Sequence, residues 1–335
     1  MQKQPSTEIV LTQPSDFQPA SLFTPTKNAT KRFIEFFTAQ INNNHTRKAY
    51  INATNRFAKW CNARNIGKLA DVEAIHIAAF VKELQQEFSA PTVKQHLAAL
   101  RMLFDWLVTG HVLNVNPAHA VHGPKYVVKK GKTPVLTAEE ARELLDKITI
   151  TRKKDGLGDG EAEPVVVGLR DRALIGVMTY TFARINAVLQ MTVKDYFVQG
   201  RRGWVRLHEK GGKEHEVPCH HTLEKYLDEY IKVADIVKDP EGPLFRTTGR
   251  KTGTQHPMWQ QDAYRMIQRR ARTANIKTRI GNHTFRATGI TAYLRNKGSL
   301  ETAQHIANHE SPRTTKLYDR RQDEISLDEV EKILI

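Results

Sequence analysis

The chain has 335 residues with 51 Lys and Arg against 36 Asp and Glu, so its formal net charge is +15. This length predicts two domains rather than one. The hydrophobic fraction of 40% suffices for ordinary cores, and no apolar run is long enough to predict a membrane span. The excess of positive charge favours a polyanionic partner, above all nucleic acid.

The N-terminus and the cysteines indicate the cellular context. Residues 1–27 are polar, carry four prolines and lack the apolar core of a signal peptide, so we expect a flexible arm. The two cysteines, Cys61 and Cys219, lie far apart and form no disulfide framework. This usage fits a reducing, cytoplasmic compartment.

Residues 28–122 predict a bundle of four or five helices. Thr46 is the expected N-cap of one helix, and the apolar face of that helix comprises Tyr50, Ala53, Phe57 and Trp60. Residues 75–88 are periodic as well. After Pro91 a third periodic stretch carries a broad apolar stripe up to Leu107.

Positive charge is concentrated in this first region and in the segment that follows it. About nine of the excess charges lie between residues 28 and 133, so we expect the helical bundle to bind DNA. Residues 123–133 combine Gly, Pro and a cationic run, which predicts an extended inter-domain linker or a solvated loop. The candidate DNA-contacting residues are Arg47, Lys48, Lys94, Arg101, Lys129 and Lys130. For each of them, phosphate contact is a more common role than base recognition.

Residues 134–322 predict a second domain. Thr137 and Glu140 form a capping box that opens a helix, and residues 153–163 predict a surface loop. Residues 165–182 predict a buried helix. Further helices are expected at residues 223–233, at residues 258–274 and in two stretches that end near Leu317.

A β-hairpin is expected within the second domain. Its strands are residues 204–209 and 214–218, and Gly211 and Gly212 suit a primed turn, which needs positive φ at both central residues. We find no internal repeat. The expected fold is therefore mostly α with a small β-sheet (α+β).

Three local patterns carry candidate chemistry, and each has an ordinary structural explanation when taken alone. Arg184 follows the buried helix, where an arginine often caps the last carbonyls. His283 and Arg286 lie three apart on one helical face, as in a phosphate site or a solvated basic turn. Tyr318 follows His309 by nine residues and could be a helix-face tyrosine whose hydroxyl is wet.

The order of these patterns resembles the tyrosine recombinase or phage integrase family over nearly the whole chain. His309, the pair Thr314-Thr315 and Tyr318 are similar to the family's GH…TT…Y signature. The resemblance implies an N-terminal helical core-binding domain and a C-terminal catalytic domain. It implies an enzyme that cuts and rejoins DNA strands at recombination sites, for integration, excision or resolution of mobile DNA.

The resemblance also implies a role for each matching residue. Arg184 and Arg286 match the arginines that grip the scissile phosphate, and Tyr318 matches the nucleophile. His283 matches the first position of the family's H-x-x-R, and His309 matches its His-or-Trp position. The run Lys210-Gly211-Gly212-Lys213 is similar to the hairpin turn that carries the catalytic lysine; Lys210 is the first choice and Lys213 the second.

The chemistry of phosphoryl transfer agrees with these roles. Two guanidiniums can neutralise the charge that develops on the non-bridging oxygens. A tyrosine is a poor nucleophile while protonated, but nearby cations lower its pKa and a neutral histidine can take its proton. A lysine can protonate the leaving oxygen. The covalent link, by resemblance a 3′-phosphotyrosine, conserves the bond energy, so neither ATP nor any other cofactor is expected.

The chain departs from the family pattern near the first arginine. Ala187 stands three residues after Arg184, where the family often has an acid that supports the site. Phe182-Ala183, Ala287 and Ala307-Asn308 replace the usual Gly-Leu, His and Leu-Gly. The run Cys219-His220-His221 lacks the spacing of zinc ligands, and we expect no metal site.

Residues 323–335 predict a C-terminal tail helix. Ser326 and Glu329 form a capping box, and an apolar stripe follows. Such a helix folds back on its own domain or, as is common in the family, docks on a neighbouring protomer. The second case implies a homotetramer on two DNA sites, associated with the bacterial nucleoid and not with a membrane.

Two other functions remain open from the sequence. The altered surroundings of Arg184 permit a DNA-binding relative with weakened catalysis, against which the complete set of six candidate residues argues. A type IB topoisomerase has similar catalytic residues. The small helical N-terminal domain and the GH…TT…Y-like tail favour recombination over strand relaxation.

Overall fold

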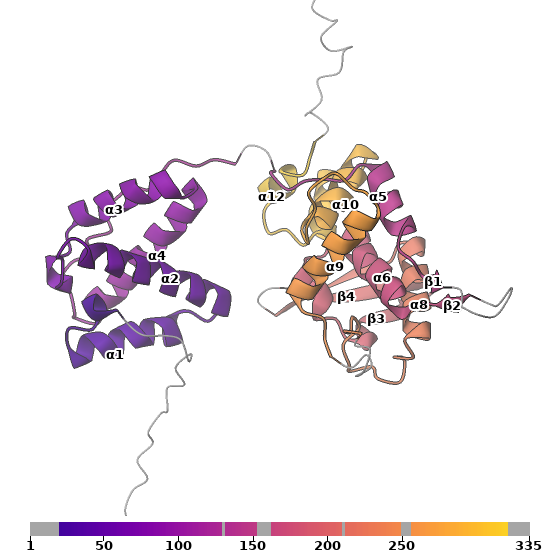
Figure 1. The fold of residues 1–335 in the computed structure, drawn as a ribbon, viewed down its shortest axis with the longest axis horizontal. Helices are drawn as coiled ribbons and strands as arrows, with labels where there is room; N and C mark the ends of the chain where they lie inside the picture. Colours follow the sequence, from indigo (N-terminus) through magenta and orange to yellow (C-terminus); the bar gives the residue numbers. More distant parts are fainter. Residues whose placement is uncertain (1–19, 129–130, 153–161, 210–211, 249–255, 321–335) are drawn as a thin grey trace, which may run out of the picture. The chain divides into compact units, whose positions relative to one another are not determined.

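A computed structural model describes residues 20–128, 131–152, 162–209, 212–248 and 256–320. The chain divides into two compact units, Met1–Val127 and Val128–Ile335 (Figure 1). Each is described by itself. Within the described ranges, no helix has the length and apolarity needed to cross a bilayer.

The N-terminal unit is helical. Its α-helices are α1 (Lys27–Glu35), α2 (Asn44–Asn62), α3 (Ala74–Glu87) and α4 (Ala90–Thr109). A turn of π-helix, Phe36–Gln40, extends α1. The core between these helices is rich in aromatic rings, among them Phe33, Phe57, Phe80 and Phe104, each at most 2% exposed.

Two expectations for this unit are wrong in detail. The N-cap of α2 is Asn43, whose Oδ1 accepts the backbone N–H groups of His45 and Thr46 at 3.0 and 3.1 Å. Asn caps at least as well as Thr, so the helix begins before Thr46. Ordered structure also begins before the expected end of the arm, because Leu22 and Phe23 are buried and Phe23 stacks on Phe33 with ring centroids 4.9 Å apart. Residues 1–19 lie outside the described ranges.

The C-terminal unit is mostly helical with small sheets, which confirms the expected fold class. Its helices are α5 (Ala138–Asp146), α6 (Val166–Tyr180), α7 (Ile185–Leu189), α8 (His221–Val233), α9 (Gln260–Thr273), α10 (Thr284–Arg295), α11 (Leu300–Ile306) and α12 (Pro312–Lys316). The strands are β1 (Thr151–Arg152), β2 (Glu163–Pro164), β3 (Tyr196–Gln199), β4 (Arg202–Glu209) and β5 (Lys213–Pro218). The capping box of α5 is present as predicted.

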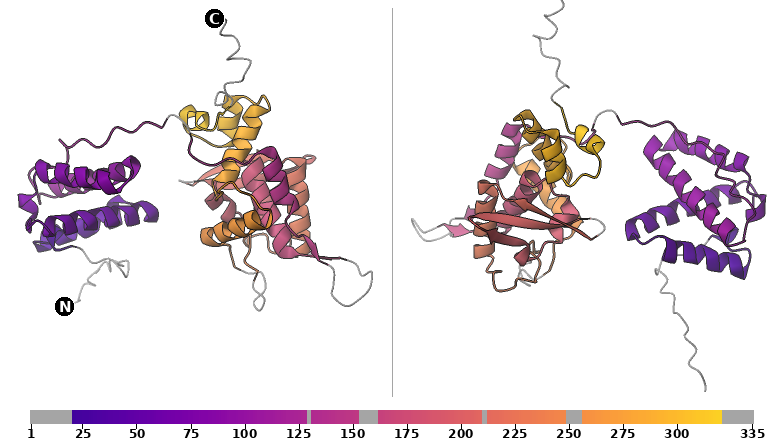
Figure 2. Two further views of the ribbon diagram at one scale, coloured as in Figure 1. Left: turned by 45° about the horizontal axis from the view of Figure 1, so that its top comes forward. Right: turned by 180° about the vertical axis from the view of Figure 1, so that it is seen from behind.

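The helices pack around α6, and the larger sheet forms one face of the unit. α6 contacts α8 and α10, and α7 contacts β4. The antiparallel sheet has the order β3-β4-β5 and is seen from its outer side in the right panel of Figure 2. Strand β3 was not predicted, and β1 and β2 pair as a short antiparallel ribbon.

The β4–β5 hairpin differs from the predicted one at its turn. Glu209 pairs with Lys213, so three residues separate the strands and the predicted two-residue primed turn is wrong. Gly212 has a φ of +74°, as expected for glycine at a positive-φ turn position. Residues along β4 alternate strictly, with Val205, Leu207 and Glu209 buried on the inner face.

A glycine allows α10 to lie close to the end of α6. A Cβ atom on Gly289 would lie 2.0 Å from the carbonyl oxygen of Thr179 and 2.8 Å from Cδ1 of Phe182. Neither backbone nor a buried ring can move away cheaply. This contact brings the first turn of α10 next to the segment that carries Arg184.

We therefore expect Gly289→Ala to lower the free energy of unfolding by about 1–3 kcal/mol, the usual cost of overpacking a core. Urea denaturation measures the change. Gly281→Ala is the matched control, since its Cβ would meet Tyr264 at an ordinary 3.5 Å. Equal stability of the two variants would contradict the close approach of α10 to the end of α6 at Gly289.

Candidate active site

Arg286, in the first turn of α10, is a buried cation whose side chain binds two backbone carbonyls. One Nη donates to the carbonyl oxygen of Phe182, and the other donates to that of Ala307 at 2.6 Å. The residue is 2% exposed. Burial and the neighbouring Arg184 lower the pKa of its guanidinium to about 10, so it stays charged at neutral pH.

Arg184 is the N-cap of the short helix α7. Its Nη1 donates to Oε2 of Glu209 on β4 at 2.6 Å, and its side chain is 39% exposed. Phe182, two residues earlier, has a φ of +55° although its ring is buried. This conformation is costly for a bulky residue, and the bond from Arg286 to the Phe182 carbonyl stabilises it.

His309 and Tyr318 stack on each other next to Arg286. Their ring centroids are 5.9 Å apart, and the ring planes differ by 8°. Nδ1 of His309 lies 2.9 Å from the hydroxyl oxygen of Thr315 on α12. Burial, together with Arg286 and Arg184, lowers the pKa of His309 to about 3, so its ring is neutral at physiological pH.

His283 immediately precedes α10 and faces the same cations. Partial burial and then the charges of Arg286 and Arg184 lower its pKa. The residue as a whole is exposed. The structure thus brings together two guanidiniums, two histidines that favour the neutral form, and the Tyr318 phenol.

Of the two candidate hairpin lysines, the structure describes only Lys213. Lys210 lies outside the described residues. Lys213 begins β5, and its Nζ lies 3.2 Å from Oε1 of Glu310, the residue after His309. The same strand is joined to α11 through Nε2 of His215, 3.0 Å from the carbonyl oxygen of Ile306. The hairpin therefore lies next to the segment that carries His309.

The candidate DNA-contacting residues fall into two groups. Arg47 donates to the Ile41 carbonyl at 2.7 Å, and Arg101 donates to the carbonyls of Ala118 and Val121, so both contribute to the fold. The other described candidates are exposed: Lys48 and Lys94. Lys129 and Lys130 lie outside the described residues.

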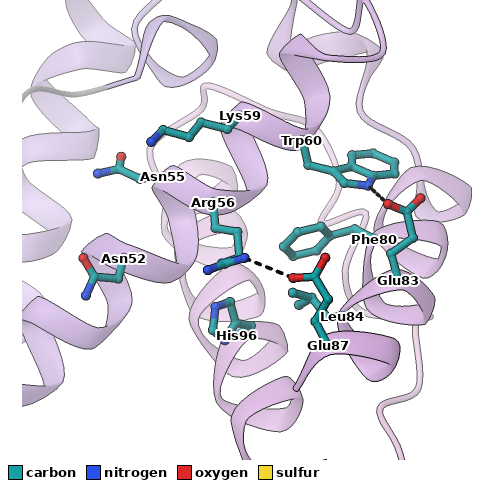
Figure 3. Close-up of a pocket in the computed structure, with 10 residues that line it drawn as sticks. All are labelled: Asn52, Asn55, Arg56, Lys59, Trp60, Phe80, Glu83, Leu84, Glu87 and His96. Carbon is teal, nitrogen blue, oxygen red and sulfur yellow. Dashed lines mark hydrogen bonds and ion pairs between the residues drawn. The ribbon is translucent and has the colours of Figure 1, made fainter. Parts of the chain in front are cut away.

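A cavity of about 760 Å³ lies between α2, α3 and α4 of the N-terminal unit (Figure 3). Arg56 pairs with Glu87 at 3.5 Å, and the indole of Trp60 donates to Glu83 at 2.9 Å. In Figure 3, Lys59 points away from both carboxylates. The paired charges and aromatic wall hold the helices together, and none of the site residues above lines this cavity.

Sequence analysis gave no role to three residues that shape the site. Thr315 contacts His309, and the Thr291 hydroxyl donates to the Tyr318 carbonyl at 3.0 Å. Glu209 binds Arg184. Two of them left a signal in the sequence. Thr315 belongs to the pair in the GH…TT…Y-like signature, and Glu209 is an acid that continues the inward-facing alternation of Val205 and Leu207.

The low pKa of His309 predicts a pH dependence of stability. The unfolded chain protonates His309 below pH 6.5, whereas the folded chain does so only near pH 3. Its stabilising contribution is therefore complete above pH 6.5 and is lost as the pH falls from 6.5 towards 3. The difference in free energy of unfolding between wild type and His309→Gln should shrink by about 2 kcal/mol from pH 7.5 to 5.

Urea titrations at several pH values measure this difference, and His256→Gln, which alters an exposed ring of the same unit, is the control. A difference between wild type and His309→Gln that stays constant with pH would show that His309 titrates alike in both states.

Comparison with known proteins assigns a family to both units. Residues 134–324 match the phage integrase family, and residues 29–112 match the phage integrase N-terminal SAM-like domain. The chain is 26% identical over 300 residues to the tyrosine recombinase XerD of Chlorobaculum tepidum, covering 88% of this chain and 92% of the relative. It is 25% identical to the tyrosine recombinase XerC of Vibrio vulnificus, with coverages of 82% and 80%.

Solved structures share the fold. The XerH recombinase in a post-cleavage complex with palindromic difH substrate has a TM-score of 0.67 at 18% identity, covering 94% of this chain and 89% of the other. A lambda integrase (residues 75–356) dimer bound to a COC′ core site has a TM-score of 0.64 at 17% identity, with coverages of 89% and 96%. The two curated relatives named above are both tyrosine recombinases. The chain therefore belongs to the phage integrase family.

Proposed function

We propose that this protein is a site-specific DNA recombinase that cleaves and rejoins strands through a covalent link between Tyr318 and a DNA 3′-phosphate. The observation that carries the proposal is the convergence of Arg184, Arg286, His309 and Tyr318 in one unit. The family membership and the names of the curated relatives support it.

The two arginines supply the electrostatic part of the mechanism. Attack on a phosphodiester adds negative charge to its non-bridging oxygens, and guanidiniums held in place beforehand stabilise that charge. Arg286 is anchored by two carbonyls, and Arg184 is anchored by Glu209. Anchored donors need no reorganisation during the reaction. Because these cations neutralise the developing charge, the proposed step requires neither a metal ion nor another cofactor.

The histidines have separate roles. When the Thr315 hydroxyl donates to Nδ1 of His309, the neutral ring keeps its proton on Nε2, and this N–H donates a hydrogen bond to the phosphate. His283, whose pKa is lowered, accepts the phenolic proton of Tyr318. A hairpin lysine protonates the leaving 5′ oxygen. The phosphotyrosine conserves the energy of the broken bond, so a 5′-hydroxyl of another strand can reverse the step.

The assembly follows from the same chemistry, because exchange between two duplexes needs several protomers. We propose a homotetramer on two recombination sites, in which the C-terminal residues 323–335 of one protomer dock on the next. A solved lambda integrase tetramer bound to a Holliday junction supports the tetrameric state, whereas residues 323–335 lie outside the described ranges. We expect the protein in the cytoplasm at the nucleoid, where its DNA substrate lies.

The domain boundaries in this proposal are those expected from the sequence. Residues 28–122 bind DNA, and the exposed Lys48 and Lys94 contact phosphates together with Lys129 and Lys130 of the linker. Residues 134–322 carry the chemistry. The presence of all six candidate residues in the sequence, with both arginines anchored, argues against a non-catalytic relative. The names of the curated relatives favour recombination over relaxation.

Tyr318→Phe should abolish covalent adduct formation while leaving DNA affinity within about twofold, since the variant lacks only the attacking oxygen. The substrate is a suicide duplex from the DNA that flanks the gene, nicked so that the 5′ end diffuses away. A shifted protein–DNA band on a denaturing gel reports the adduct. An adduct from the variant, or none from the wild type on DNA that it binds, would overturn the proposal.

The acid for the leaving oxygen can be assigned to Lys210 or Lys213 with a modified substrate. A 5′-bridging sulfur leaves without a proton, so the variant that lacks the acid should recover most of its cleavage rate. We expect Lys210→Ala to lose about 100-fold or more on normal DNA, the usual range for a general acid, and to recover on the sulfur substrate. Lys213→Ala should lose little on either. Recovery by Lys213→Ala alone would reverse the assignment.

A further inference from the structure

Glu209 is an acid at a buried position of a strand. It ends β4 on the inner face, in the alternating series that contains Val205 and Leu207, and its side chain is 5% exposed. A carboxylate in such a position costs free energy unless a cation or hydrogen-bond donors compensate its charge. Its location therefore calls for a specific partner.

That partner is Arg184, whose Nη1 lies 2.6 Å from Oε2 of Glu209. The distance is that of a strong, charge-assisted hydrogen bond. Because the arginine is 39% exposed whereas the carboxylate is buried, the guanidinium is bound from the inside and open to solvent on its other side. Its remaining donors can then face a phosphate.

Helix α7 offers no acid of its own for this purpose. Ala187 lies one turn after Arg184, where a side chain shares the face of the arginine, but it is apolar and 2% exposed. α7 packs against β4, which places Glu209 opposite the start of that helix. The charge of Glu209 also raises the pKa of the neighbouring Arg286 and so opposes the depression caused by Arg184.

We propose that Glu209 is a positioning residue for strand cleavage: it holds Arg184 in the orientation that binds the scissile phosphate. Glu209 is the last residue of β4 and directly precedes Lys210 in the sequence. The position of Arg184 therefore depends on how β4 packs against α7. This inference rests on the proposed function, because it concerns the phosphate that Tyr318 attacks.

The test compares single-turnover rates of adduct formation on the suicide duplex. Glu209→Gln keeps the shape but removes the charge, and we expect the rate to fall about 10- to 100-fold, within the range of coupling between contacting residues. Glu209→Asp keeps the charge and should recover part of the rate. DNA affinity and melting temperature are recorded for each variant, because a merely structural role would change those instead.

Glu216→Gln is the matched control. Glu216 lies on the same hairpin and pairs with Arg206 at 2.9 Å, but on its outer, exposed face. Removal of this ion pair should change the cleavage rate less than about twofold, since exposed pairs contribute little. A loss as large as that of Glu209→Gln would mean that any damage to the hairpin slows cleavage, and would overturn the specific role.

A double-mutant cycle decides whether Glu209 acts through Arg184. In an Arg184→Ala background, the further change Glu209→Gln should leave the rate unchanged or raise it, because the residue that it positions is gone and a buried unpaired charge is removed. An equal loss in both backgrounds would overturn the inference. If the wild type forms an adduct and Glu209→Gln cleaves at the same rate, this inference is wrong and the proposed function stands. If the wild type forms no adduct on DNA that it binds, the proposed function itself is wrong.

Discussion

The buried guanidinium of Arg286 is the constraint on which the site depends. A cation that is 2% exposed is stable only when its donors are satisfied. Both carbonyls that satisfy it lie where helices end: Phe182 follows α6, and Ala307 follows α11. The carboxyl end of a helix carries partial negative charge, so these two ends stabilise the cation beyond the two hydrogen bonds. Three segments that are distant in sequence are thereby joined at one point.

This arrangement also places the neighbouring site residues. Phe182 lies two residues before Arg184, and Ala307 lies two residues before His309. In each case a residue with positive φ, Phe182 at +55° or Asn308 at +46°, turns the chain at the helix end. The carbonyl therefore points to Arg286 while the chain continues into the site. Burial and the same cations then lower the pKa of His309 and keep it neutral, so the cluster gains a hydrogen-bonding ring and no further charge.

Residue order and spacing carried more information about the candidate site than about its contacts. Candidate site residues could be named because Arg, His and Tyr serve phosphoryl transfer at recognisable spacings. The bond between Glu209 and Arg184 could not, since it joins two elements whose packing the sequence does not state. The wrong N-cap at Thr46 has a local cause, because Asn43 offers equally good capping chemistry three residues earlier. The hairpin turn was wrong because glycines that tolerate positive φ do not by themselves fix the number of residues between the strands. Strand β3 is short and was missed because four residues carry little periodic signal.

The segment that bears Tyr318 is anchored through its backbone. The Tyr318 carbonyl accepts a bond from Thr291, and its N–H donates to Thr315 at 2.9 Å. One residue earlier, the Leu317 carbonyl accepts the N–H of Gly131 at 3.1 Å, and a Cβ at Gly131 would meet that oxygen at 2.4 Å. The start of the C-terminal unit thus packs directly on the segment that bears Tyr318. These anchors fix the main chain at Tyr318, so packing within the C-terminal unit itself sets the position of its ring beside His309.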